Sequence, residues 1–114
     1  MKQLFSCTVV LKPQRATAYL TGELDMATAE CLFACLAPLA ASGKHVIVDL
    51  SGLDFLGIIG PIVLADLHRC ASAKGGSVRL AEVTAMANRV LALTGTQDRL
   101  TVDTSAAECM AAEL

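Results

Sequence analysis

A short apolar run in the middle of the chain, HVIVDL at residues 45–50, constrains the fold more than any other feature. Its apolar residues do not alternate with polar ones, which is typical of a central strand covered on both faces. Sheets covered on both faces are built from strands that alternate with helices. The run therefore predicts an α/β fold.

The segments around this run alternate between strand-like and helix-like patterns. Further strands are expected over residues 4–11, 16–21, 77–80 and 100–102, and helices from near Met26 to about Ser42, from the 57–61 segment to about Lys74, from Thr84 to Gly95, and from Ser105 onward. The order β-β-α-β-α-β-α-β-α predicts an α/β sandwich with a mixed sheet of four or five strands and about four helices. The 114 residues are room for a single domain, 1–114.

Local signals refine these boundaries. Asp25 is well placed to cap the helix that begins near Met26. Pro38 is expected to kink that helix or to end it early. Ser51 and Gly52 predict a turn directly after the central strand.

Apolar residues at helical spacing predict the sides of the helices that face the core. The first stripe contains Leu32, Leu36 and Leu39, and the second contains Val63, Leu64, Leu67 and Ala71, opposite Asp66, Arg69 and Ser72.

Composition excludes several classes of protein. Hydrophobic residues make up 54% of the chain and the formal net charge is −2, with no basic cluster and four scattered aromatic residues, so direct binding of nucleic acid is not expected. The longest nearly uncharged stretch, 26–43, falls short of the roughly 20 apolar residues of a membrane span. The first six residues lack the apolar region of a signal peptide. Five cysteines, an odd number, favour the reducing cytoplasm over a disulfide framework.

Catalytic signatures are missing. His45 and His68 have no cysteine or carboxylate nearby at metal-ligand or triad spacing, and we expect both to be structural or surface residues. Gly75 and Gly76 precede a strand, which is the wrong context for a phosphate-binding loop. We therefore expect no enzyme activity, no metal and no cofactor.

Four segments carry a resemblance to a known family. They are GELD at 22–25, DLSGLDFLGIIG at 49–60, GSVRL at 76–80 and RVLALTG at 89–95. In this order they resemble the motifs of the STAS domain family, the anti-sigma-factor antagonists, whose central pattern is roughly D-L-S-G-[LVI]-x-F-[IL]-D-S-S-G-L. The α/β order derived above agrees with the fold of that family.

The resemblance implies a regulatory binding module. Such domains bind an anti-sigma factor that is also a serine kinase and thereby release a sigma factor. The kinase phosphorylates the first serine of D-S-S-G, and the added charge breaks the complex. In this chain Ile58 takes the place of that serine and Pro61 replaces the usual leucine, so the phosphorylation switch is absent.

The changed loop leaves two interpretations open. Ile58 and Ile59 either pack inward as the remnant of a lost switch, or they lie exposed and bind the partner regardless of kinase activity. The predicted partner-binding residues are Asp25, Gly57, Ile58, Ile59 and Gly60. Asp25 is also explained as a helix cap, and Ser51, the nearest other hydroxyl, as a turn residue that bonds local backbone.

The cysteines suggest a second kind of regulation. A disulfide between Cys70 and Cys109 would join two helices if their Cα atoms lie within about 7 Å. Cys31 and Cys35 lie four residues apart on one helix, where a disulfide is not favoured and would change the conformation little. Cys7 is expected in the core.

Two other functions compete with the antagonist. One is a STAS subunit, not phosphorylated, of a larger assembly such as a lipid-transport or stress-signalling complex. The other is a small thiol oxidoreductase, against which the missing Cys-x-x-Cys motif argues. The antagonist is expected to be a cytoplasmic monomer or weak dimer.

Overall fold

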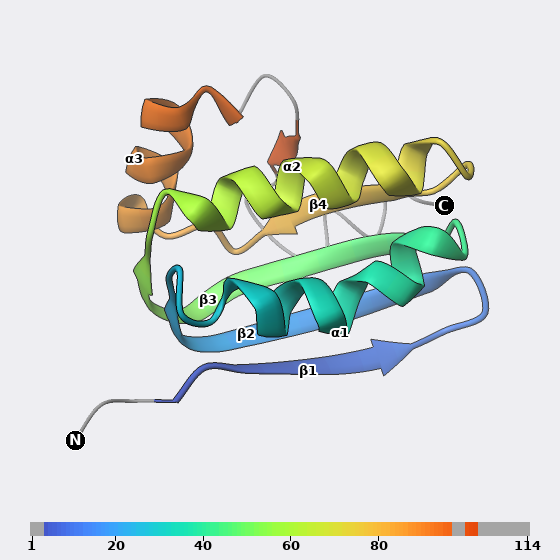
Figure 1. Cartoon of the computed structure of the whole chain (residues 1–114), viewed down its shortest axis with the longest axis horizontal. Helices are drawn as coiled ribbons and strands as arrows, with labels where there is room; N and C mark the ends of the chain where they lie inside the picture. Colours follow the sequence, from blue (N-terminus) through green and yellow to red (C-terminus); the bar gives the residue numbers. More distant parts are fainter. Residues whose placement is uncertain (1–3, 97–99, 103–114) are drawn as a thin grey trace.

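The strands follow one another across the sheet in the order in which they occur along the chain. The computed structural model describes residues 4–96 and 100–102, and its strands are β1 (Ser6–Leu11), β2 (Arg15–Leu24), β3 (His45–Leu56), β4 (Ser77–Ala81) and β5 (Thr101–Val102). β1 pairs antiparallel with β2, and the other neighbours are parallel. The predicted mixed sheet is confirmed (Figure 1).

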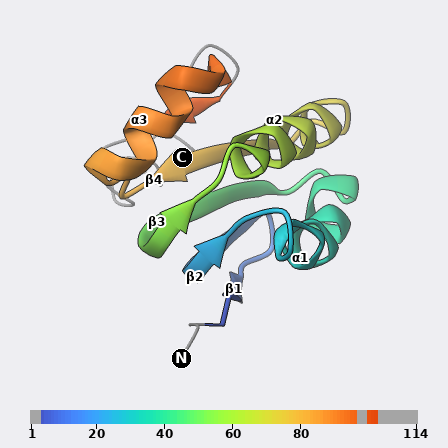
Figure 2. The same ribbon diagram turned by 60° about the vertical axis from the view of Figure 1, so that its left-hand side comes forward.

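Helices connect the parallel strands. They are α1 (Ala29–Ala41), α2 (Ile59–Ser72) and α3 (Ala85–Thr94). Figure 2 shows α1 and α2 side by side along the sheet, with α3 beyond α2. The alternating order is thus confirmed as far as β5, and the helix expected from Ser105 onward lies outside the described residues. Within 4–96 and 100–102, no helix is long and apolar enough to cross a membrane.

One hydrophobic core joins the three helices to one face of the sheet. β2 and β3 supply alternate residues to it, and the helices supply their predicted stripes, with Leu39 and Val63 only partly buried. The large, fully buried side chains of this core include Leu20, Leu24, Leu32, Leu36, Val46, Val48, Leu50, Leu64, Leu67, Leu80 and Leu91.

The central strand is buried on both faces, as predicted. Residues 46–50 of β3 are all buried, and Ile47 forms a second small cluster with Ala81 away from the main core. β3 pairs with β2 on one side and β4 on the other. Its neighbours in the sheet therefore hold it along both edges.

The predicted turn at Ser51 and Gly52 is wrong, because β3 continues to Leu56. The pairing with β2 shifts by one residue here, which is the signature of a β-bulge. Asp49 Oδ1 accepts hydrogen bonds from the Ser51 backbone N–H at 2.9 Å and from Ser51 Oγ at 2.6 Å. Polar residues that suggest a turn thus bind one another within a continuing strand.

The predicted boundaries of α1 also need correction. The helix begins at Ala29, three residues later than expected, because Met26–Thr28 form a turn. Pro38 neither ends the helix early nor prevents its continuation to Ala41. It lies on the exposed side, where water can satisfy a carbonyl that lacks its helical partner.

Both ends of α3 match the prediction. Thr84 is the N-cap and its hydroxyl accepts a hydrogen bond from the Ala87 backbone N–H at 3.2 Å. Gly95 ends the helix in the left-handed conformation, with φ of 71°.

Gly76, between α2 and β4, is expected to tolerate no side chain. A Cβ there would strike the Lys44 carbonyl oxygen and lie 2.5 Å from that of Gly43. Gly76→Ala should lower the free energy of unfolding by about 2 kcal/mol, since backbone would have to shift. Urea unfolding measures this effect. Gly57→Ala is the control, because a Cβ there meets its nearest atoms at 3.4 Å, and equal losses in both variants would contradict the prediction.

Candidate functional site

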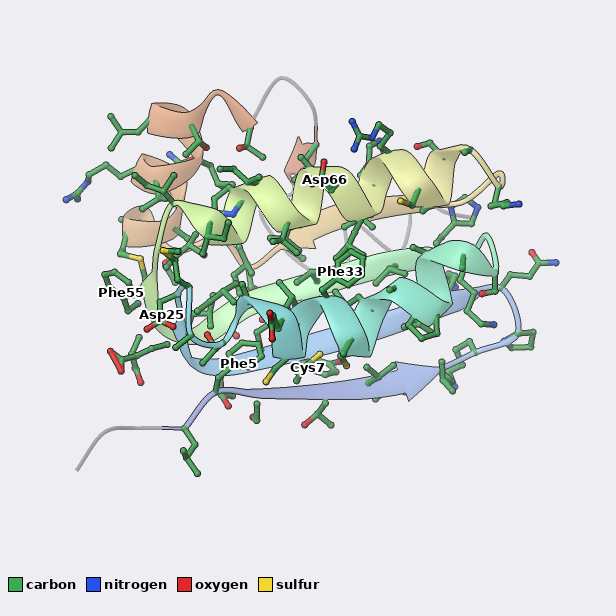
Figure 3. The ribbon with its side chains drawn as sticks, viewed as in Figure 1. Phe5, Cys7, Asp25, Phe33, Phe55 and Asp66 are labelled. Carbon is green, nitrogen blue, oxygen red and sulfur yellow. The ribbon has the colours of Figure 1, made fainter. Side chains whose placement is uncertain are left out.

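The loop between β3 and α2 lies at the carboxyl ends of β2 and β3. The Gly57 backbone N–H donates to the Leu24 carbonyl oxygen at 2.7 Å, and the Gly60 N–H donates to the Gly57 oxygen at 3.0 Å. Figure 3 shows Asp25 and Phe55 together at this end of the sheet. The carboxyl edge of parallel strands is where α/β proteins commonly place their sites.

Gly60 lies beneath this loop and brings α2 close to the sheet. It is buried, and a Cβ in its place would lie 2.6 Å from Leu56 Cδ1 and 3.0 Å from Leu24 Cδ2. Gly60, one of the predicted partner-binding residues, is therefore a buried packing position and not part of the exposed surface.

Ile58 and Ile59 differ in exposure. Ile58 is 65% exposed, and as the N-cap of α2 it offers no side-chain hydrogen bond to the helix. Ile59 is partly buried. Inward packing of both residues, one of the two interpretations of the sequence, is therefore wrong for Ile58.

A group of large apolar side chains is exposed around Ile58. We call it the β3–α2 apolar surface, and its exposed members are Met26, Phe33, Phe55, Ile58, Ile62 and Leu93. Two adjoining hollows form it and share Met26 and Ile59 in their walls. The larger, of about 530 Å³, is also lined by Asp25 and Gly57. Exposed apolar patches of this kind mark interaction sites.

The sequence analysis missed most members of this surface, although a signal was present. Ile62 lies one helical turn before Asp66 and two before Arg69, which form an exposed ion pair at 2.9 Å. An isoleucine on the polar side of an amphipathic helix does not serve the core. Phe33 directly follows the buried Leu32, and Leu93 lies two residues after the buried Leu91, yet both are exposed.

Asp25 organises the turn that leads into α1. Its Oδ1 accepts hydrogen bonds from the Ala27 N–H at 2.9 Å and the Thr28 N–H at 3.2 Å. The Thr28 hydroxyl lies 3.3 Å from the same oxygen and donates to the Glu23 carbonyl at 2.8 Å. Asp25 therefore caps a turn before the helix, and it does so at the edge of the apolar surface.

The other polar candidates have structural partners. His45 Nδ1 lies 2.9 Å from Ser77 Oγ, and His68 Nδ1 accepts a hydrogen bond from the Val78 N–H at 3.0 Å, so each ring has a partner within the fold. The Ser51 hydroxyl donates to the Asp49 side chain within β3, and not to the backbone of a turn as expected. The described residues hold no cluster of three or more His, Cys, Asp or Glu side chains arranged for a metal.

The cysteines are placed differently from what the sequence suggested. Cys70 is exposed on α2, and Cys109 lies outside the described residues, so the Cys70–Cys109 disulfide stays a prediction. Cys7 is only partly buried, and it contacts Cys35, a pair that the sequence analysis did not consider.

Comparison with known proteins identifies the family. The model of the STAS domain matches residues 10–109, which is most of the chain. The chain belongs to the STAS domain family. No curated protein sequence matches it significantly.

Solved structures share the STAS fold at low sequence identity. An anti-sigma factor antagonist from Mycobacterium paratuberculosis superposes with a TM-score of 0.87 at 21% identity, covering 98% of this chain and 97% of that one. The anti-sigma factor antagonist SpoIIAA in its unphosphorylated form gives 0.75 at 19% identity, covering 94% and 93%. The murine solute carrier 26 family member A9 anion transporter gives 0.72 at 21% identity, covering 85% of this chain and 17% of the transporter.

Asp25→Ala is expected to lower the free energy of unfolding by about 1 kcal/mol, because two backbone N–H groups lose their acceptor. Urea unfolding measures the stability of this variant. The control is Asp54→Ala, which removes an exposed carboxylate of β3. Equal stability of the two variants would show that Asp25 does not hold the turn.

Proposed function

We propose that this STAS domain is an anti-sigma-factor antagonist that docks on its anti-sigma factor through the β3–α2 apolar surface. The observation that carries the proposal is the exposure of Ile58 within that surface. The likeness to antagonist structures over nearly the whole chain supports it. Release of a sigma factor would then regulate transcription from the cytoplasm.

The composition of the surface suits a protein partner. Phenylalanine, methionine and isoleucine side chains from β3, α1, α2 and the turns before the two helices line it, and large anchors of this kind dominate binding energy in protein interfaces. Leu93 and Met26 are more than 80% exposed. Covering them removes much apolar area from water, which favours association.

Control of this complex by phosphorylation is not expected at residue 58. Ile58 has no hydroxyl, and the Ser51 hydroxyl, in β3, is bonded to Asp49. A partner of the serine-kinase type would therefore bind this chain equally well in the presence of ATP or ADP. The proposed complex is constitutive with respect to the kinase.

A subunit role in a larger assembly is the alternative. The matched region of the murine transporter makes up 17% of that chain, so the same fold also occurs inside a larger protein. A surface without a phosphate acceptor at residue 58 suits a permanent subunit as well. The identity of the bound partner distinguishes the two functions.

Ile58→Glu tests the surface directly. A charge in a desolvated apolar contact should weaken binding to the anti-sigma kinase at least about 100-fold, or roughly 3 kcal/mol. Folding should survive, because a carboxylate at the N-terminus of α2 is favoured by the helix dipole. Isothermal titration calorimetry with the candidate kinases of the source organism, each with ATP or ADP, measures the affinity.

Leu11→Glu is the matched control. Leu11 is 60% exposed, close to the value for Ile58, but lies at the opposite end of the sheet, where it pairs with Ala16. It should leave affinity unchanged. Equal affinity of wild type and Ile58→Glu would overturn the proposed surface, and wild-type binding to no kinase, with co-purification of a multi-subunit complex, would favour the alternative.

A further inference from the structure

Cys7 and Cys35 meet between the first strand and the first helix. Cys7 lies on the inward side of β1, with Phe5 and Val9, and Cys35 lies in the middle of α1. The Cys35 thiol donates to the Cys7 sulfur, and the two Sγ atoms are 3.0 Å apart. Figure 3 shows Cys7 directed from β1 toward α1.

The geometry is close to that of a covalent bond. A disulfide has a sulfur–sulfur distance of about 2.0 Å, so closure requires a movement of about 1 Å. The two cysteines are 28 residues apart in the chain, and a bond between them would join a strand to a helix. Cys31, one turn earlier in α1, and Cys70, in α2, are exposed.

We propose that Cys7 and Cys35 form a reversible redox site, which low-molecular-weight disulfides such as oxidised glutathione convert to an intramolecular disulfide. The site is independent of the proposed docking surface and of its partner. It also differs from the Cys70–Cys109 pair that the sequence suggested.

The reaction is a thiol–disulfide exchange in two steps. Cys35 loses its proton to solvent and attacks one sulfur of the oxidant, which forms a mixed disulfide and releases the first small thiol. Cys7 then loses its proton and attacks Cys35 Sγ, which forms the Cys7–Cys35 bond and releases the second. Two protein thiols are oxidised, and one small disulfide is reduced to two thiols.

The surroundings assign the order of attack. Burial raises the pKa of the Cys7 thiol to about 12. The thiolate is the attacking species, so Cys7 is a poor first nucleophile at neutral pH. Its contact with Cys35 makes it the resolving cysteine, since the second step is intramolecular.

The disulfide would attach the edge strand β1 to α1. Within the described residues β1 pairs with β2 alone, by one antiparallel ladder. A link to α1 adds a second attachment and closes a long chain segment, which restricts the unfolded state. The oxidised protein should therefore unfold at a higher temperature, by on the order of 10 °C.

The test uses the full chain with Cys31, Cys70 and Cys109 replaced by Ser, so that only the proposed pair remains. The folded protein is incubated with oxidised glutathione and then alkylated and digested. Mass spectrometry should find the peptides of Cys7 and Cys35 linked, and dithiothreitol should reverse the link. Thermal unfolding of the oxidised and reduced forms measures the shift.

Cys7→Ser on the same background is the control, with folding checked by circular dichroism. It should stop at the mixed disulfide, with glutathione retained on Cys35. The proposal is overturned if the variant that keeps both Cys7 and Cys35 yields no linked peptide or only mixed disulfides. It is also overturned if oxidation leaves the unfolding temperature of that variant unchanged.

Discussion

The burial of β3 on both faces is the constraint on which the rest of the molecule depends. Residues 46–50 are enclosed, and β2 and β4 hold the strand by parallel ladders. Such a strand has one position in the sheet and one register, because a slip would expose apolar groups and break hydrogen bonds. Because β3 is fixed, the loop that follows Leu56 is fixed as well, and so is the start of α2.

The start of α2 serves both the core and the surface. Gly60 allows α2 to approach Leu56 and Leu24, while Ile58, two residues earlier, stands in solvent. The turn held by Asp25 brings Met26 to the same place. Exposed apolar groups of this size cost solubility, and a partner that covers them recovers that free energy.

Local signals predicted much of the fold, and they failed where one residue type serves two purposes. Thr84 and Gly95 marked both ends of α3, because caps act within one turn of the chain. The prediction of a turn at Ser51 is wrong because polar residues of this kind occur in turns and in β-bulges alike. The bond to Asp49 fits either structure, and only the register with β2 distinguishes the turn from the bulge. Asp25 was recognised as a cap, but the turn between it and α1 was not.

The sequence by itself determined the α/β class, the order of the elements as far as β5, and the family motif with isoleucine at residue 58. These properties follow from residue periodicity and short-range spacing. Only the tertiary structure decided that Phe55 and Leu93 join Ile58 on one surface, and that Cys7 contacts Cys35. Such neighbours come from different elements, and contact between them depends on how the crossovers pack, which periodicity within one element does not encode.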